Sequence, residues 1–263
     1  MYAFAEADDI TFQLETLQDL LDPSTRMVLD SLDDPTGQEW LEIGHGLGSI
    51  ARELSRRIGP TGVVHATDLD ARPVTAPTDG APIRTFPLDL RTDELPRRPY
   101  RGIHGRLVLL HIPERRAILP RLVDVLEPGG VLVIEDWYCP EPPRVLACAD
   151  PADEKVFTEV VAGILAVLRS RGADLEWAAE TKDAFVEAGL IDVRVTRTDA
   201  DCAGPGLAHR LYACNARQLR AQLLALGVDQ DLLDRFQKVA AQPGLVTTGW
   251  RLISTIGTKP DPR

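Results

Sequence analysis

Residues 39–70 read EWLEIGHGLGSIARELSRRIGPTGVVHATDLD, and this stretch decides the fold. It opens with a short apolar run through Trp40 and Ile43, which is typical of a buried strand. Alternating glycines follow, then a helix-forming stretch (residues 50–58) and a second apolar run that closes on Asp68. Strand, glycine-rich turn, helix and strand in this order predict a right-handed βαβ unit. Glycines let backbone approach a ligand closely, and an acid after the second strand can accept hydrogen bonds from ribose hydroxyls.

Two cofactor classes use such a unit, and the glycine spacing separates them. The dinucleotide fingerprint G-x-G-x-x-G requires glycine at position 49, where this chain has Ser49. A nicotinamide-dependent oxidoreductase is therefore disfavoured. The pattern found is Glu42-x-Gly44-x-Gly46-x-Gly48, with Asp68 placed 24 residues after Gly44. It resembles motif I of the class I S-adenosylmethionine-dependent methyltransferases.

The resemblance implies S-adenosyl-L-methionine as cofactor and S-adenosyl-L-homocysteine as product. The glycine turn would pack against the methionine half, Asp68 would hold the ribose, and Asp89 would accept from the adenine amino group. His45 would contribute its backbone, and Asp89 has the alternative role of a turn cap. The implied cofactor-binding residues are Glu42, Gly44, His45, Gly46, Gly48, Asp68, Leu69, Asp89, Leu90 and Arg106.

A second block strengthens the resemblance. The sequence Leu126-Glu-Pro-Gly-Gly130 is close to the family's L-x-P-G-G turn before the fifth strand. It predicts a helix over residues 118–126, stopped by proline, and a tight reversal into the apolar strand 131–134. Residues 100–102 (Tyr-Arg-Gly) depart from the usual Phe-Asp, and Leu110-His111 replaces the commonly paired histidines.

The predicted fold class is α/β, a Rossmann-like, seven-stranded, mostly parallel sheet. The resemblance also implies a last strand inserted antiparallel between strands five and six. The chain is interpreted as a single methyltransferase domain. Its parts are a helical cap (residues 1–34), a cofactor-binding core (35–138) and two helical substrate-cap insertions (139–175 and 200–247). The cap is predicted as two helices separated at residues 22–25, Asp-Pro-Ser-Thr.

Composition limits the functional classes. The chain has 263 residues, 44% of them hydrophobic, and a net charge of −11, which opposes binding to nucleic acid. It contains no apolar run near 18 residues and no leader, so we expect a cytoplasmic protein without membrane contact. The four cysteines lack C-x-x-C spacing, and Asn215 is the single asparagine, so no metal site is predicted. Residues 106–109 (Arg-Leu-Val-Leu) lack the [DNS]-P-P-[YFW] loop of nucleic-acid amino-methylases. We expect a monomer or homodimer.

Aromatic residues mark the expected substrate region. Ligands of open parallel sheets lie beyond the carboxyl ends of the strands. Trp137 and Tyr138 follow the fifth strand and are candidate substrate walls, and Tyr2 and Phe4 from the helical cap could line the same pocket. Ordinary packing is the alternative for each of these four side chains.

Methyl transfer from a sulfonium is an in-line displacement whose leaving group departs neutral. The protein must align the nucleophile with the methyl group and, for a protonated acceptor, supply a base. The candidate bases are His111, Glu135 and His209, with His104, Asp136 and Tyr138 as further titratable groups near the strand ends. A structural role in packing or in a salt bridge is the alternative for each.

Two functions from different classes follow. The first is O-, N- or C-methylation of a small molecule, such as an aromatic or indole-type natural product of bacterial secondary metabolism. The alternative is a cofactor-binding protein of the same fold that catalyses a rearrangement or acts in regulation, because binding the cofactor and consuming it are separable.

Overall fold

The computed structural model describes residues 10–262 of the chain. Tyr2 and Phe4 lie outside the described residues, so their predicted role stays a prediction. Contacts divide the chain into two compact units. The sheet unit comprises Asp22–Asp136, Trp177–Arg197 and Leu252–Arg263, and the helical unit comprises the chain through Leu21, Trp137–Glu176 and Thr198–Arg251. The single-domain interpretation of the sequence is not decided by this division.

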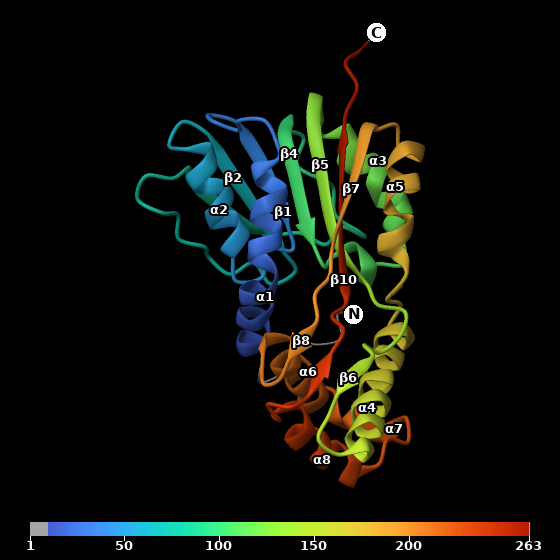
Figure 1. The fold of residues 1–263 in the computed structure, drawn as a ribbon. Coiled ribbons are helices and arrows are strands. Elements are labelled where there is room, and N and C mark those ends of the chain that lie inside the picture. The colour runs from blue at the N-terminus through green and yellow to red at the C-terminus, as the bar shows by residue number, and fades with distance from the viewer. Residues whose placement is uncertain (1–9, 263) are drawn as a thin grey trace. The chain divides into compact units, whose positions relative to one another are not determined.

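A seven-stranded sheet forms the sheet unit, in the order β3-β2-β1-β4-β5-β10-β7. Neighbouring strands from β3 to β5 are parallel. Figure 1 shows β10 running opposite to β5 between β5 and β7. The predicted fold class is therefore confirmed. The strands are β1 (Glu39–Ile43), β2 (Val63–Asp68), β3 (Ile83–Pro87), β4 (Tyr100–Arg106), β5 (Leu126–Tyr138), β7 (Ile191–Thr198) and β10 (Arg251–Thr258).

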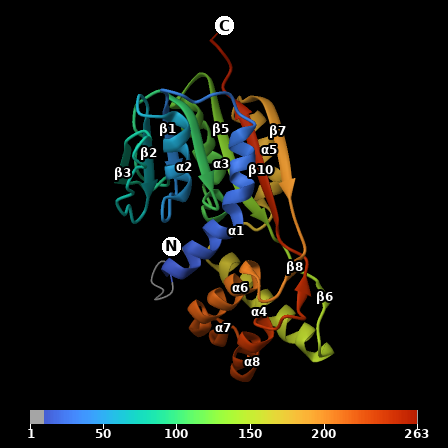
Figure 2. The same cartoon turned by 60° about the vertical axis from the view of Figure 1, so that its left-hand side comes forward.

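Helices cover both faces of this sheet (Figures 1 and 2). Helix α2 (Ser49–Ile58) packs its buried face on Trp40 of β1 and on β2, together with Leu29 of α1 (Ile10–Asp30). Helices α3 (Arg115–Asp124) and α5 (Trp177–Glu187) lie on the opposite face, and the 3-10 helix η1 spans Leu109–His111. Since both faces are covered, most side chains of the inner strands β1 and β4 are buried, and these include the polar Glu42 and His104.

Helix α1 is continuous, so the predicted break at residues 22–25 is wrong. Pro23 lies inside the helix and removes one backbone hydrogen bond. Tertiary contacts of the residues that follow it offset that loss. Thr25 donates to Glu135 at 2.6 Å, and Val28 packs on Val133 in a buried cluster.

The Pro128-Gly-Gly segment also differs from the prediction, since it is an irregular stretch within β5 rather than a reversal before it: Gly129 has a φ of 71°, and the pairing with β4 shifts register between Leu126 and Val131. The Gly129 amide donates to the Lys259 carbonyl at 2.9 Å, and the Lys259 amide donates to Gly130 at 2.8 Å. A Cβ on Gly130 would lie 3.0 Å from the Tyr100 carbonyl oxygen, so glycine permits this close approach. Helix α3 ends at Asp124, two residues earlier than expected.

The helical unit contains the predicted insertions. Its core includes an aromatic cluster, in which Phe157 packs against Tyr212 and Phe236. The sequence did not reveal its small antiparallel sheet, in the order β6-β9-β8, because strands of two or three residues are too short to show a period. Its elements are β6 (Val145–Ala147), α4 (Pro151–Ser170), β8 (Cys202–Ala203), α6 (Leu207–Gln218), α7 (Arg220–Ala225), α8 (Gln230–Ala240) and β9 (Val246–Thr247). Within residues 10–262, no helix combines the length and apolarity that crossing a bilayer requires.

The packing of Trp40 on Gly102 gives a test of the sheet. These residues are register partners on β1 and β4, and a Cβ on Gly102 would lie 2.4 Å from carbons of the indole. We expect Gly102→Ala to lower the free energy of unfolding by about 1–3 kcal/mol through overpacking. Denaturant titration measures this. Gly244→Ala, whose Cβ would meet nothing within 4 Å, is the control. Equal stability of the two variants would contradict the packing.

Candidate functional site

The turn between β1 and α2 requires glycine at three positions. Gly44, Gly46 and Gly48 have φ of 70°, 55° and 79°, a region that side chains with a Cβ disfavour. A Cβ on Gly44 would lie 2.3 Å from a methyl of Val108, and one on Gly48 would lie 2.5 Å from a methyl of Val74. Both conformation and space therefore explain the alternating glycines.

Four of the five amide groups of this turn, all but that of Leu47, have an acceptor among the contacts of residues 10–262. Gly44 and His45 donate to the Thr67 carbonyl at 2.7 and 3.0 Å, and Gly48 donates to the His45 carbonyl at 2.7 Å. Gly46 donates to Asp68 Oδ2 at 2.9 Å. A pyrophosphate is bound by free amides at such a turn, and these four amides are already engaged. The arrangement also places the carboxylate of Asp68 beside the turn, as predicted for the ribose-binding acid.

His45 is a buried polar side chain of this turn. Its side chain is 5% exposed, yet neither ring nitrogen has a hydrogen-bond partner among residues 10–262. An unsatisfied buried polar group costs about 1–3 kcal/mol. The amino and carboxylate groups of a methionine moiety would offset this cost. The residues at the turn therefore fit S-adenosylmethionine, with a contribution from the His45 side chain that the sequence did not indicate.

The adenine-side residues follow β3. Asp89 accepts from the side chain of Arg91 at 2.6 Å and from its amide at 3.0 Å, and these hydrogen bonds lower the pKa of Asp89. This is the turn-capping contact named as the alternative role of Asp89. Leu90 is buried and Leu69 is exposed.

Three buried charged groups lie in a row across the sheet, on the face that α1 covers. His104 of β4 is the register partner of Glu42. Its Nδ1 lies 2.7 Å from Glu42 Oε2, and its Nε2 lies 3.0 Å from Glu135 Oε2. Two carboxylates need two donors, and only the doubly protonated imidazole has two. Burial opposes this charge, but the two carboxylates raise the pKa of His104 to about 9.

The row continues to α1 and β10. Glu135 accepts from Ser254 Oγ through Oε1 and from Thr25 Oγ1 through Oε2, both at 2.6 Å. Burial raises the pKa of Glu135, but the hydrogen bonds and charge of His104 outweigh it, so the pKa is lowered. Arg106 donates to Thr25 at 2.8 Å and to Asp22 at 2.9 Å. The structure thus places Glu42, Arg106 and Glu135 in one connected network.

Sequence reasoning missed Asp22, Thr25 and Ser254. The sequence offered only a weak signal for them: each is a polar residue close to apolar residues that are expected to be buried. Asp136 faces away from this network because successive side chains of a strand alternate. Burial raises the pKa of Asp136 well above its usual range.

The three predicted bases have different surroundings. Burial, with a smaller effect of Arg115, lowers the pKa of His111 to about 4, so its imidazole is neutral at physiological pH. Glu135 accepts hydrogen bonds from three side chains. His209 belongs to the helical unit, where its Nε2 lies 3.3 Å from Thr247 Oγ1 and burial lowers its pKa. Their catalytic roles stay predictions.

The candidate substrate residues Trp137 and Tyr138 also belong to the helical unit. The ring of Trp137 meets Trp250 edge to face at 5.3 Å between centroids, and Trp250 meets Tyr212 at 4.9 Å. Trp250 and Tyr212 were not singled out from the sequence, since isolated aromatics in an insertion carry no pattern. The three rings form the aromatic set of the helical unit (Trp137, Tyr212 and Trp250).

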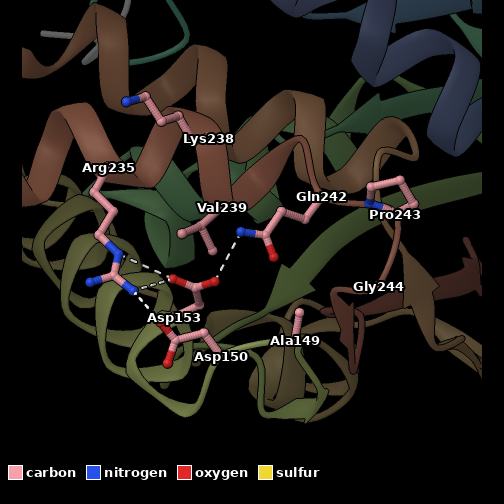
Figure 3. A pocket seen from close by; sticks show the side chains of 9 residues that line it. All are labelled: Ala149, Asp150, Asp153, Arg235, Lys238, Val239, Gln242, Pro243 and Gly244. Carbon is pink, nitrogen blue, oxygen red and sulfur yellow. Dashed lines mark hydrogen bonds and ion pairs between the residues drawn. The ribbon is translucent and has the colours of Figure 1, made fainter.

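A cavity of about 560 Å³ in the helical unit lies between α4 and α8 (Figure 3). Asp153 is buried there and accepts from Arg235 at 2.6 Å and from Gln242 at 2.9 Å. None of the predicted site residues lines it, and its polar groups connect α4 to α8. Among residues 10–262, no group of three or more His, Cys, Asp or Glu side chains is placed to bind a metal. Lining residues are Ala149, Asp150, Asp153, Arg235, Lys238, Val239, Gln242, Pro243 and Gly244.

The buried row predicts how stability depends on pH. The pKa of His104 is about 6.5 when unfolded and about 9 when folded. The folded state therefore binds an extra proton between these values, and stability should fall as pH rises from about 6.5 to 9. Denaturant titrations at pH 6, 7.5 and 9 measure this. His104→Gln should remove most of this pH dependence, and the same slope in both proteins would contradict the assignment.

Comparisons with known proteins agree with this geometry. A family model described as "Methyltransferase domain" matches residues 13–180. An uncharacterised methyltransferase of Mycobacterium tuberculosis is 34% identical over 116 residues, which cover 43% of this chain and 57% of that protein. The aklanonic acid methyltransferase DauC of a Streptomyces species is 26% identical over 114 residues, covering 41% of this chain and 52% of that one. The chain thus matches little more than half the length of these relatives.

Solved structures share the fold. The YcgJ protein of Bacillus subtilis superposes with a TM-score of 0.56 and 13% identity, covering 92% of this chain and 100% of that one. The family match spans well over half of the 263 residues and includes the glycine turn and the buried row. The chain therefore belongs to the methyltransferase domain family, whose cofactor is S-adenosylmethionine.

Proposed function

We propose that this protein transfers a methyl group from S-adenosylmethionine to a small-molecule acceptor by in-line displacement. The observation that carries the proposal is the turn at residues 44–48. Its glycines have positive φ, the amides of Gly44, His45, Gly46 and Gly48 have acceptors within the protein, and Asp68 lies beside it. That combination suits an adenosyl ligand with a methionine moiety and disfavours a pyrophosphate.

The chain's own residues would bind and orient. Asp68 has the position to accept from ribose hydroxyls, and the unpartnered ring of His45 could meet the methionine moiety. The bound cofactor supplies an electrophilic methyl group on a sulfonium. The protein's main contribution is alignment, which can lower a barrier by about 7–11 kcal/mol.

We infer that the acceptor is small and partly aromatic. The aromatic set of the helical unit favours ring stacking, and such pairs add about 0.5–1.5 kcal/mol beyond area burial. The name of DauC specifies a methyltransferase of aklanonic acid, so secondary metabolism is a reasonable setting for this chain. The net charge of −11 opposes nucleic acid as acceptor. A cytoplasmic location and a monomeric or homodimeric state belong to the same proposal.

The alternative is a protein of this family that binds the cofactor without transferring its methyl group. Its support is the burial and full hydrogen bonding of Glu135, which make one candidate base a structural group. Fold alone does not separate the two functions.

The glycine turn gives the first test. Gly48 and Gly59 flank α2 and have φ of 79° and 69°, so alanine is strained at both. Only at position 48 would the new Cβ also meet a neighbour, Val74, whereas at position 59 it meets nothing within 4 Å. We expect Gly48→Ala to weaken S-adenosylhomocysteine binding by about tenfold or more, and Gly59→Ala to leave affinity within about twofold. Calorimetry measures both, and equal affinities would place the ligand elsewhere.

Turnover gives the second test. Incubation with S-adenosylmethionine and a panel of phenols, amines and indoles should release S-adenosylhomocysteine with at least one methylated acceptor, detected by mass spectrometry. Cofactor binding without any product across the panel would favour the alternative function.

The pH dependence of that turnover separates the candidate bases. If His111 removes the proton, the rate should stay level down to about pH 5, because its pKa of about 4 keeps the imidazole unprotonated. His111→Ala should then lower the rate by about 100-fold, against parallel assays of Glu135→Gln and His209→Ala. A protonation between pH 6 and 7 that abolishes activity would exclude His111 as the base.

A further inference from the structure

One hydrogen-bonded path begins and ends at the glycine turn. Glu42 lies two residues before Gly44, and Ser49 directly follows Gly48. Ser49 Oγ donates to Asp22 Oδ1 at 3.0 Å, which adds the last connection to the buried row. The path therefore closes a ring around the turn. Its members, in order, are Glu42, His104, Glu135, Thr25, Arg106, Asp22 and Ser49.

In this closed path, His104 connects Glu42 of β1 to Glu135 of β5. It is fully buried, with an exposed fraction of 0%. Among residues 10–262, the carboxylate of Glu42 accepts one hydrogen bond, and it comes from His104. Glu135, in contrast, also accepts from Thr25 and Ser254. Without the imidazole of His104, the buried carboxylate of Glu42 loses this donor. The hydrogen-bonded connection from Glu42 to Glu135 and α1 is then broken.

We propose that His104, with a proton on each ring nitrogen, is a positioning residue of the cofactor site: it fixes Glu42 beside the glycine turn and connects it, through Glu135 and Thr25, to α1. The inference rests on the proposed function, because it needs the cofactor at this turn. A Glu42 carboxylate held in one orientation meets the cofactor without an ordering cost. A carboxylate released from His104 must be ordered again on binding, which lowers affinity.

The matched test substitutes two buried histidines. His104→Gln removes the bridge between the carboxylates. His65→Gln makes the same change on β2, where His65 is 4% exposed and lies between Phe86 and Tyr100 with Glu39 at 3.8 Å. We expect S-adenosylhomocysteine affinity to fall about tenfold or more in His104→Gln and to change less than about twofold in His65→Gln. Calorimetry of His104→Gln with wild-type affinity would overturn the proposal.

The pH profile of binding separates positioning from general loss of stability. The charged groups that face His104 are Glu42 from β1 and Glu135 from β5, while α1 and β10 present only the hydroxyls of Thr25 and Ser254. Loss of the His104 proton should therefore weaken wild-type binding by about fourfold between pH 8 and 9.5. The amino group of the ligand contributes the same pH dependence with the wild-type protein and with His104→Gln. The measured quantity is therefore the loss of wild-type affinity beyond the loss seen with His104→Gln. Identical profiles would overturn the proposal.

A second pair of variants, each a Thr→Val substitution in α1, tests the proposal if His104→Gln does not fold. Thr25→Val keeps shape but removes the hydroxyl that connects Glu135 to Arg106. Thr16→Val makes the same change on the same helix, where the hydroxyl of Thr16 donates, within the described part of the chain, to the Phe12 carbonyl of its own helix. We expect Thr25→Val to weaken binding about threefold relative to Thr16→Val, and equal affinities would overturn the proposal. Failure of the wild-type protein to bind the ligand would instead refute the proposed function.

Discussion

The interaction on which the sheet unit depends is the pair of carboxylates that face one imidazole ring from two sides. Burying three ionisable groups is costly unless each is paired and hydrogen-bonded. Here Glu42 and Glu135 each approach a different nitrogen of His104. The hydroxyls of Thr25 from α1 and Ser254 from β10 donate two further hydrogen bonds to Glu135. The charges come from β1, β4 and β5, so their pairing specifies how three central strands, one helix and the inserted strand come together.

This constraint also explains the shape of α1. A proline in a helix usually ends or kinks it, because it removes one hydrogen bond and crowds the preceding turn. In α1, the residues on either side of Pro23 contribute to the network, Asp22 through Arg106 and Thr25 through Glu135. Their contacts are available only when the helix continues through the proline. The structure thus offsets a local defect with a polar interface that a sequence pattern does not reveal.

Much of the fold could be predicted from local sequence, for identifiable reasons. The alternating glycines, Asp68 and the apolar run of β5 report backbone conformation and strand burial within a few residues. The position of β10 between β5 and β7 agrees with what the family resemblance implied, and no local pattern predicted it. The network could not be predicted, because His104 and Glu135 are 31 residues apart and Thr25 and Glu135 are 110 apart. Their contact depends on register and on helix placement. Predictions that used only local proline rules failed at Pro23 and Pro128, where tertiary contacts determine the conformation.

The position of β10 has a consequence for synthesis on the ribosome. Of the seven strands it is the latest in chain order, yet it pairs in the sheet interior between β5 and β7. Until residues 251–258 leave the exit tunnel, β5 and β7 expose unpaired backbone edges, and Glu135 lacks the hydroxyl of Ser254. Until then the nascent sheet has two unpaired strand edges. Such edges favour binding by chaperones over early independent folding.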